Sequence, residues 1–373
     1  MFWFLFIVSL IAGLYIILIT RYYWAWKQMS SVTTLEVGGT TLVSIVIAAR
    51  NEQNNISKLL NCLKTQNYDS SLFEVILVND HSTDDTYKIT SKFQEQFINL
   101  KAFNLPEGIE GKKNALKYGV NEAKGELILT LDADCQVGMS WVKAIASFYE
   151  KTSFKLIVCP LLYNSEINIF GKIQSLEIIS LVASGAGAVA LNRPIFCNGA
   201  NLAFSREVYY EVNHKLKTEI SSGDDVFLLL AVKKKWPNSI GFLKSCEAVA
   251  YTLPEPDLVS FFSQRKRWSS KSRFYKDFDI LYTATIVFAC NISIILSLIF
   301  TLFYPKFIFL FISLLCLKSL PDYLLIQSFS KYFNKAYLLK YFAMVQLVYP
   351  FYLVSVAVFG SIGNYKWKNR TCK

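Results

Sequence analysis

Residues 126–134 read ELILTLDAD, and this stretch decides the fold class of the chain. Its apolar and β-branched residues predict a short strand that is buried on both faces and runs directly into Asp132 and Asp134. Two similar stretches come earlier, LVSIVIAA at 42–49 and FEVILVND at 73–80. Helices are expected at 51–66, up to Phe97, and at 111–123. This alternation of strands and helices predicts an α/β fold with a mostly parallel sheet.

The acidic residues of this region follow the predicted strands. Glu52 comes after the first strand, Asp80 ends the second, and Asp132 and Asp134 end the third. The carboxyl ends of parallel strands meet at one edge of the sheet, and open α/β sheets bind their ligands beyond that edge. We therefore expect these carboxylates to collect on one rim.

The N-terminal stretch has the character of a membrane anchor. Residues 2–20 contain no charged side chain and are about long enough to cross the hydrocarbon core of a bilayer. No positive charge precedes them and no cleavage site of small residues follows, so we predict an uncleaved anchor over 1–21. Arg21, Lys27 and the aromatic residues between them form a collar typical of the membrane interface. The positive-inside rule then places the following domain, 40–275, in the cytoplasm.

The sequence becomes membrane-like again after residue 280. We predict a membrane domain of about three helices over 281–363, with spans at 281–303, 306–327 and 337–361. A further apolar stretch, 176–191, is short and contains Glu177, so we expect a buried or interfacial helix there. Three spans would leave the basic C-terminus outside the cell, so either one span is re-entrant or interfacial, or the positive-inside rule fails. A multi-pass protein of the cell (inner) membrane is expected.

Composition limits the class of protein. Hydrophobic residues make up 53% of the 373 residues and charged residues 18%, against about 25% charged residues in soluble domains. The net charge is +11, but nine of the basic residues and one acidic residue lie after residue 280, beside apolar stretches. We therefore expect no nucleic-acid partner, because such a protein would concentrate its positive charge on the folded domain. His81 and His214 are the only histidines, which argues against a histidine-based triad or metal site.

Asp132 and Asp134 are the strongest chemical signal in the chain. Residues two apart in an extended chain point to the same side. Both carboxylates could then face Mg²⁺ or Mn²⁺, which prefer oxygen ligands and also bind diphosphates. A solvent-exposed turn is the alternative explanation for this pair taken alone.

Two predicted helix starts add charged groups. Residues 111–113 read GKK, and two ammonium groups at a helix N-terminus suit a phosphate, although exposed lysines on an ordinary helix would have the same sequence. Residues 223–225 read GDD. One aspartate is enough to satisfy the helix dipole, so the second could act as a general base.

Residues 264–268 read QRKRW and lie just before the membrane domain. One explanation is an interfacial helix whose basic residues, including Arg265 and Lys271, face lipid head groups. Another is a ligand site in which Arg267 binds phosphate and Trp268 stacks on a sugar ring. Arg265 and Lys271 fit the first explanation well, whereas for Gln264, Arg267 and Trp268 the residues alone leave both explanations open.

Taken in order, these motifs resemble those of the family 2 glycosyltransferases, the inverting GT-A group that includes cellulose, chitin and hyaluronan synthases. The resemblance covers residues 42–268, where VSIVIAARNE, VNDHSTD, GKKNAL, LDAD, NGANLAF, GDD and QRKRW follow in family order. Ala48 stands where the family often has proline, and Asn79 where it often has aspartate. The resemblance implies an α/β GT-A fold, Rossmann-like with a mostly parallel sheet, and transmembrane helices at both termini.

On the donor side, the resemblance assigns roles to six residues. Three of them would hold the uracil and ribose of a UDP-sugar: Ala49, Glu52 and Asp80. Lys112 would bind the diphosphate, and Asp132 would contact the ribose or the metal-bound phosphate. Asp134 would ligate Mg²⁺ or Mn²⁺.

On the acceptor side, the resemblance makes Asp225 the general base, with Asp224 beside it where glutamate is more usual. Three residues would lie near the acceptor and the diphosphate: Gln264, Arg267 and Trp268. The QRKRW motif is typical of processive synthases, although addition of a single sugar stays open.

The resemblance implies a membrane-bound, metal-dependent transferase that moves a sugar from a UDP-sugar to a lipid-linked or growing saccharide. Asp225 would take the proton of the acceptor hydroxyl as that hydroxyl attacks C1, and a single displacement would invert the anomeric centre. Membrane lipids would surround the protein, and a homo-oligomer or an export partner is a further expectation. Two alternatives stay open: a nucleotidyltransferase or sugar-phosphate transferase on the same fold, and a catalytically inactive membrane scaffold.

Overall fold

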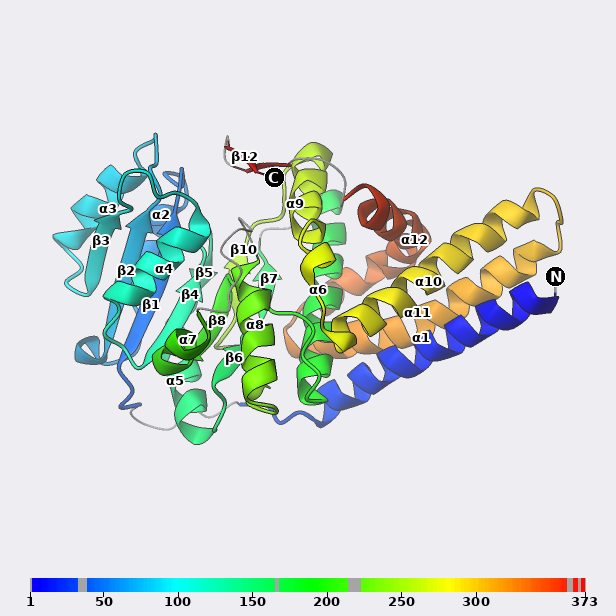
Figure 1. The fold of residues 1–373 in the computed structure, drawn as a ribbon, viewed down its shortest axis with the longest axis horizontal. Helices are drawn as coiled ribbons and strands as arrows, with labels where there is room; N and C mark the ends of the chain where they lie inside the picture. Colours follow the sequence, from blue (N-terminus) through cyan, green and yellow to red (C-terminus); the bar gives the residue numbers. More distant parts are fainter. Residues whose placement is uncertain are drawn as a thin grey trace.

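The chain forms an α/β domain from which several long helices project on one side (Figure 1). The computed structural model describes residues 2–32, 39–164, 168–213, 223–360, 365–367 and 370–372. His214 therefore lies outside the described residues.

The central sheet has the strand order β3-β2-β1-β4-β8-β6-β9. Its strands are β1 (Val43–Ala49), β2 (Phe73–Asn79), β3 (Leu100–Asn104), β4 (Leu127–Leu131), β6 (Leu156–Val158), β8 (Asn201–Ser205) and β9 (Ile240–Phe242). β1 pairs in parallel with β2 and β4, β2 with β3, and β6 with β9, whereas β8 runs antiparallel to β4 and β6. The predicted α/β fold with a mostly parallel sheet is confirmed.

The other described strands form two smaller sheets. β5 (Gln136–Val137), β10 (Ala250–Thr252) and β7 (Leu161–Tyr163) form a three-stranded sheet in that order. Near the C-terminus, β11 (Tyr365–Trp367) pairs with β12 (Arg370–Cys372) in an antiparallel ladder.

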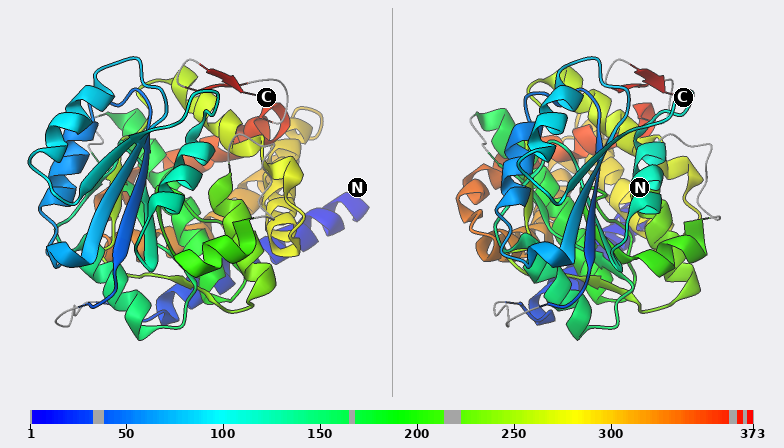
Figure 2. Two further views of the ribbon diagram at one scale, coloured as in Figure 1. Left: turned by 60° about the vertical axis from the view of Figure 1, so that its left-hand side comes forward. Right: turned by 90° about the vertical axis from the view of Figure 1, so that its left-hand side faces the viewer.

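Helices cover both faces of the central sheet (Figure 2). Their bounds are α2 (Ile56–Lys64), η1 (Ser70–Leu72), α3 (Thr86–Gln94), α4 (Lys112–Glu122), α5 (Trp141–Lys151), α7 (Arg206–Asn213) and α8 (Asp224–Lys235). Apolar residues of α2 and α5 share one core cluster with the sheet, and those of α4, α7 and α8 share the other.

Two of the predicted helices are shorter than expected. The helix predicted from 51 starts only at Ile56, because Asn51 has a positive φ of 52° and its backbone N–H donates to the hydroxyl of Ser82. The helix predicted to reach Phe97 ends at Gln94. The third, expected over 111–123, is α4.

The apolar stretch around 176–191 forms α6 (Ile169–Ala190), which packs against the α/β domain and the long helices. Most of its side chains are buried, and Glu177 is 8% exposed. One apolar core cluster therefore runs from one face of the sheet through α6 into the helix bundle. The predicted helix is present and mostly buried, and nothing in the structure tests whether it also crosses a membrane.

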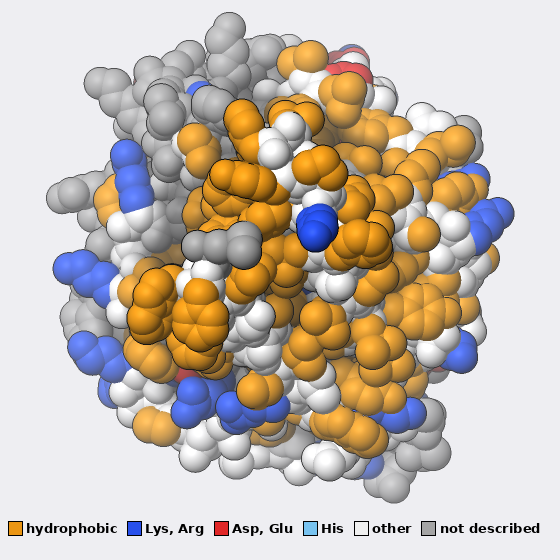
Figure 3. All heavy atoms as spheres, turned by 90° about the vertical axis from the view of Figure 1, so that its right-hand side faces the viewer, with side chains coloured by type: hydrophobic (Ala, Val, Ile, Leu, Met, Phe, Trp, Pro, Cys, Tyr) orange, Lys and Arg blue, Asp and Glu red, His pale blue; other side chains and the backbone are white. Residues whose placement is uncertain are grey.

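The remaining helices form the bundle and its junction with the sheet domain. They are α1 (Phe2–Gln28), α9 (Leu258–Ser269), η2 (Ser272–Phe274), α10 (Phe278–Thr301), α11 (Phe307–Tyr332), η3 (Ala336–Tyr341) and α12 (Phe342–Phe359). Within the described part of the chain, length and composition would allow five helical segments to cross a membrane: α1, α6, α10, α11 and 336–358. Hydrophobic side chains cover much of the face over the far ends of the bundle (Figure 3).

The C-terminal end of α1 is anchored in the α/β domain. Trp26 is 1% exposed and its ring lies 4.8 Å from that of Phe329 in α11. The ammonium group of Lys244 donates to the carbonyls of Trp26 and Met29 at 2.9 Å each. Trp26 was expected in the interfacial collar. It is instead buried at the junction with the α/β domain, which α1 reaches because the helix continues to Gln28.

The segment formed by η3 and α12 begins and ends beside the α/β domain. Lys335, just before η3, donates to the carbonyl of Tyr163 at 2.9 Å. Gly360, just after α12, lies so close to Ser269 of α9 that an added Cβ would be 1.9 Å from its hydroxyl oxygen. Both ends of this segment therefore lie on the same side of the bundle, unlike the ends of α10 and α11.

A buried polar cluster joins three of the long helices. Lys318 of α11 donates to carboxylate and amide oxygens of Asp322 and Gln346 at 2.7 Å each. The hydroxyl of Tyr15 in α1 donates to the other oxygen of Asp322 at 2.7 Å. Because each charged group has its partners within the cluster, the cluster links α1, α11 and α12 without leaving a buried charge unpaired.

We predict that Lys318→Met destabilises the folded protein by about 3–5 kcal/mol, because it leaves the buried Asp322 carboxylate without its opposite charge. Thermal unfolding in detergent measures the effect as a lower melting temperature. The control is Lys306→Met, at an exposed lysine that precedes the same helix, and it should melt like the wild type. Equal melting temperatures for all three proteins would contradict the prediction.

Candidate active site

A cleft of about 630 Å³ lies between the carboxyl end of β4, the start of α8, and α9. It is lined by eight of the residues selected from the sequence: Lys112, Asp132, Asp134, Asp224, Asp225, Gln264, Arg267 and Trp268. These residues are spread over more than 150 positions of the chain, so it is the fold that brings them together.

The other three predicted residues lie beside the cleft and do not line it. The backbone N–H of Asp80 donates to the carbonyl of Ala49 at 2.8 Å, which joins the ends of β1 and β2. A carboxylate oxygen of Asp80 accepts from the N–H of Gly111 at 3.0 Å, so Asp80 also fixes the start of α4. Glu52 accepts from the side chain of Asn55 at 2.9 Å, and Asn55 does line the cleft.

Lys112 and Asp132 form an ion pair with 2.5 Å between Nζ and Oδ1. Gly111 caps α4 with a φ of 99°, a conformation that favours glycine and lets the helix start at Lys112. Burial acts to lower the pKa of Lys112, but attraction to Asp132 outweighs it and raises the pKa above its usual value. Lys112 therefore stays positively charged and can bind an anion at the helix N-terminus.

Asp134 lies two residues beyond Asp132 and accepts from the hydroxyl of Thr252 at 3.2 Å. Among the residues that the structure describes, no group of three or more His, Cys, Asp or Glu side chains could hold a metal. Mg²⁺ is usually bound by one or two carboxylates together with substrate phosphates, and not by an all-protein cage. Asp132 and Asp134 on the wall of one cleft fit that kind of metal site.

Asp225 is held rigidly at the start of α8. One carboxylate oxygen accepts from the N–H of Gly199 at 3.0 Å and the other from the N–H of Val226 at 2.8 Å. Each oxygen has more than one lone pair, so both keep acceptor capacity toward the cleft. The carboxylate is thus fixed where it can accept a proton from a bound hydroxyl.

Asp224 differs from its neighbour in its surroundings. Burial raises its pKa, and the ammonium group of Lys113, 3.2 Å away, opposes that rise. Lys113 belongs to α4, so this pair connects α4 to α8 behind the wall of the cleft. The two adjacent aspartates therefore suit different tasks: Asp224 pairs with a lysine, and Asp225 is oriented by backbone groups.

Lys271 lines the same cleft, although the sequence favoured a position among lipid head groups. Its side chain fits because Gly223 has no Cβ: an added Cβ would be 2.8 Å from Cδ of Lys271, and φ is 97° at Gly223. Burial lowers the pKa of Lys271, and the nearby Asp225 opposes this shift. No local signal in the sequence could have placed Lys271 there, because α9 ends at Ser269 and the fit depends on Gly223, which is distant in the sequence.

Arg265 is the second basic residue whose expected position was wrong. It is 2% exposed and pairs with Glu177 of α6, so it faces the protein interior and not lipid head groups. Gln264, Arg267 and Trp268 of the same helix line the cleft. Residues of α9 therefore point in different directions around the helix: Arg265 toward Glu177 of α6, and the other three toward the cleft.

The NGAN turn at 198–201 lines the cleft with its first three residues, and Asn201 anchors the turn in the fold. Asn201 is fully buried, accepts from the indole N–H of Trp141 at 3.1 Å, and donates to the carbonyls of Pro160 and Ala248. The turn matters to the cleft through Gly199, whose N–H orients Asp225.

Comparison with known proteins gives matches in sequence and in fold. Residues 44–212 match the family described as Glycosyl transferase family 2. The chain is 30% identical over 115 residues to Glycosyltransferase AglE of Haloferax volcanii, covering 31% of this chain and 38% of that protein. It is 29% identical over 143 residues to Beta-monoglucosyldiacylglycerol synthase of Nostoc sp., covering 38% of this chain and 31% of that protein.

A third relative is Poly(ribitol-phosphate) beta-N-acetylglucosaminyltransferase TarS of Staphylococcus aureus, 31% identical over 108 residues, or 29% of this chain and 19% of that protein. The matches thus span between 19% and 38% of these curated relatives. Among solved structures, Mannosyltransferase PcManGT from Pyrobaculum calidifontis in complex with GDP-Man and Mn²⁺ shares the fold. Its TM-score is 0.54 at 16% identity, over 91% of this chain and 99% of that one.

We predict that Lys113→Met lowers stability more at neutral pH than in acid. The raised pKa of Asp224 means that its charged form is disfavoured in the folded state. The resulting loss of folding stability is absent below about pH 4, where the carboxyl is protonated in both states, and grows as pH rises through the folded-state pKa. Without Lys113 that pKa rises further. Melting temperatures of variant and wild type should therefore differ little in acid and clearly at pH 7.

The control is Lys124→Met, at an exposed lysine just beyond α4, which should show no such pH dependence. A difference between Lys113→Met and wild type that is the same at both pH values would contradict the assignment of the effect to Asp224.

Proposed function

We propose that the protein transfers a sugar from a UDP-sugar to a lipid-linked or growing saccharide. Two findings support this proposal: residues 44–212 match glycosyl transferase family 2, and the chain has a GT-A fold. One observation carries the proposal. A carboxylate oriented by two backbone N–H groups, Asp225, shares a cleft with cationic groups and with the strand-end carboxylates Asp132 and Asp134.

The donor would lie along the rim of the sheet. Ala49, Glu52 and Asp80 would hold the uracil and ribose, and Lys112 would exchange part of its contact with Asp132 for the diphosphate. The uracil specificity rests on the resemblance of the motifs; the related fold named above was solved with GDP-Man, so both nucleotides belong in the assay. Asp134 would hold Mg²⁺ or Mn²⁺, which would neutralise charge on the diphosphate.

The chemistry would need one displacement. Asp225 takes the proton of the acceptor hydroxyl as its oxygen forms a bond to C1 of the sugar, and the bond between C1 and the diphosphate oxygen breaks. Lys112, Arg267 and Lys271 stabilise the negative charge on the leaving diphosphate. Attack on the face opposite the leaving group inverts the anomeric centre.

The membrane arrangement we propose has a cytoplasmic catalytic domain. α1, α10 and α11 would cross the bilayer, and the segment 336–359, whose two ends lie beside the α/β domain, would be interfacial or re-entrant. This choice keeps the basic C-terminus in the cytoplasm, as the positive-inside rule requires. Of the two alternatives left open by the sequence, the re-entrant or interfacial one is therefore preferred.

We predict that Asp225→Asn lowers transfer about 10²–10⁴-fold, the usual contribution of a general base, while leaving UDP binding intact. Asp134→Asn should instead abolish the part of UDP binding that depends on Mn²⁺. UDP release from a panel of nucleotide sugars, together with calorimetry of UDP binding, measures both effects. The exposed Glu122→Gln is the control. Transfer at the wild-type rate by Asp225→Asn would reject the proposed base.

We also predict that UDP binding weakens as pH rises through the lowered pKa of Lys271, because its ammonium group loses the charge that attracts the diphosphate. Lys271→Met should bind UDP about tenfold more weakly at pH 7 and lack this alkaline decline, since a hydrogen bond to a charged group is lost. Lys271→Arg should move the decline to higher pH. The exposed Arg273→Gln serves as control, and a wild-type titration that is flat up to pH 10 would be inconsistent with this role.

A further inference from the structure

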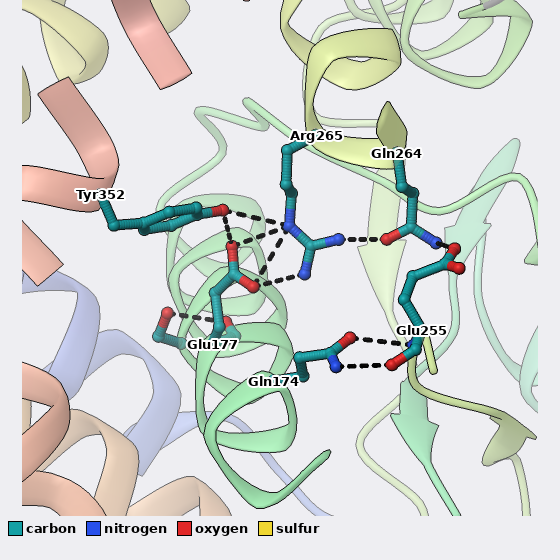
Figure 4. Close-up of polar contacts among 7 residues, drawn as sticks. Gln174, Glu177, Glu255, Gln264, Arg265 and Tyr352 are labelled. Atoms are coloured by element: carbon teal, nitrogen blue, oxygen red, sulfur yellow. Dashed lines mark hydrogen bonds and ion pairs between the residues drawn. The ribbon is translucent and has the colours of Figure 1, made fainter. Parts of the chain in front are cut away.

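A continuous row of polar side chains connects α12 to the cleft (Figure 4). It runs from Tyr352 in α12 through Glu177 in α6 to Arg265 and Gln264 in α9, and ends at Glu255 in the loop before α9. The proposed displacement uses none of these residues, although the family resemblance placed Gln264 near the acceptor.

The centre of the row is a buried ion pair. Nε of Arg265 donates to a carboxylate oxygen of Glu177 at 2.9 Å, a second guanidinium nitrogen donates to the other oxygen, and the hydroxyl of Tyr352 also donates to Glu177. The guanidinium carbon lies 4.3 Å from the ring centres of both Phe261 and Trp268. A buried charge held by this many contacts has one available orientation.

The orientation of Arg265 determines that of Gln264. A guanidinium N–H donates to the side-chain oxygen of Gln264, which turns the amide nitrogen toward Glu255. That nitrogen donates to a carboxylate oxygen of Glu255 at 2.5 Å.

Glu255 is also fixed through its backbone. Its N–H donates to the side-chain oxygen of Gln174 in α6, and its carbonyl accepts from the side-chain nitrogen of Gln174, both at 2.9 Å. Glu255 lines the cleft together with Gln264, Arg267 and Trp268. Burial raises its pKa and the nearby Arg267 opposes the rise. Figure 4 shows that one of its carboxylate oxygens has no contact among the residues drawn.

We propose that Glu255 binds a hydroxyl group of the acceptor, and that Glu177 of α6 and Arg265 of α9 are positioning residues that hold Glu255 and Gln264 in place. The inference rests on the proposed transferase function and narrows its acceptor class. Two carboxylates, Asp225 and Glu255, on the acceptor side of the cleft favour neutral hydroxyls of a sugar or glycerol group over an acceptor phosphate. The row ends in the cleft and not in the core, which distinguishes it from a purely structural link.

The test measures UDP release by the full-length protein in detergent against three acceptors: diacylglycerol in vesicles, maltotriose, and a polyprenyl phosphate. With a hydroxyl acceptor, Glu255→Gln should raise the acceptor KM about tenfold, as expected for loss of a hydrogen bond to a charged group. The KM for the UDP-sugar is measured in parallel, and a rise as large as that of the acceptor KM would place Glu255 on the donor side and overturn the assignment. Glu247→Gln, at an exposed glutamate outside the cleft, is the matched control.

An unchanged acceptor KM in Glu255→Gln, or use of the polyprenyl phosphate alone, would overturn the assignment of Glu255. Failure of the proposed function itself would be seen in the wild type, as no UDP release with any donor and acceptor, and would overturn both.

The positioning role is tested with Tyr352→Phe, which keeps the ring and removes one donor to Glu177, and with Glu177→Gln. Both should raise the acceptor KM, by about threefold for the milder Tyr352→Phe, with kcat and the KM for the UDP-sugar unchanged. A lower melting temperature with a wild-type acceptor KM in Tyr352→Phe would show a purely structural link and reject the positioning role.

Discussion

The parallel pairing of β1 with β2 and β4 is the constraint on which the rest of the molecule depends. It places the ends of three strands at one edge of the sheet, so Ala49, Asp80 and Asp132 become neighbours although they are far apart in the sequence. The N-terminus of α4 is tied to the same edge through Gly111 and Asp80. The cleft therefore contains both carboxylates and ammonium groups, which in the proposed function would bind a diphosphate and its metal.

The second determinant is α6, which lies between the sheet and the long helices. Its apolar residues continue the core of the α/β domain into the bundle, so the two parts of the chain share one core cluster. Glu177 is the exception on this helix, and its pairing with Arg265 fixes the QRKRW helix against α6. The catalytic cleft is therefore walled on one side by elements that also contact the bundle.

The strands, the rim and most of the cleft residues could be predicted from the sequence, because apolar strand patterns and strand-end acids are local signals. Eight of the eleven selected residues line one cleft. The positions of Arg265, Lys271 and Trp26 could not be predicted, because each depends on a partner distant in sequence: Glu177, Gly223 and Phe329. A basic residue beside an apolar span has the same local sequence whether it faces lipid or a buried carboxylate.

The central claim is that the nucleotide sugar binds at the strand-end rim, with its reacting carbon toward Asp225. A structure of the protein determined by electron cryo-microscopy with UDP and Mn²⁺ tests it most directly. We expect Mn²⁺ on Asp134, the diphosphate against Lys112, and the uridine along Ala49 and Asp80. Nucleotide bound away from this rim, or a metal held without Asp134, would contradict it.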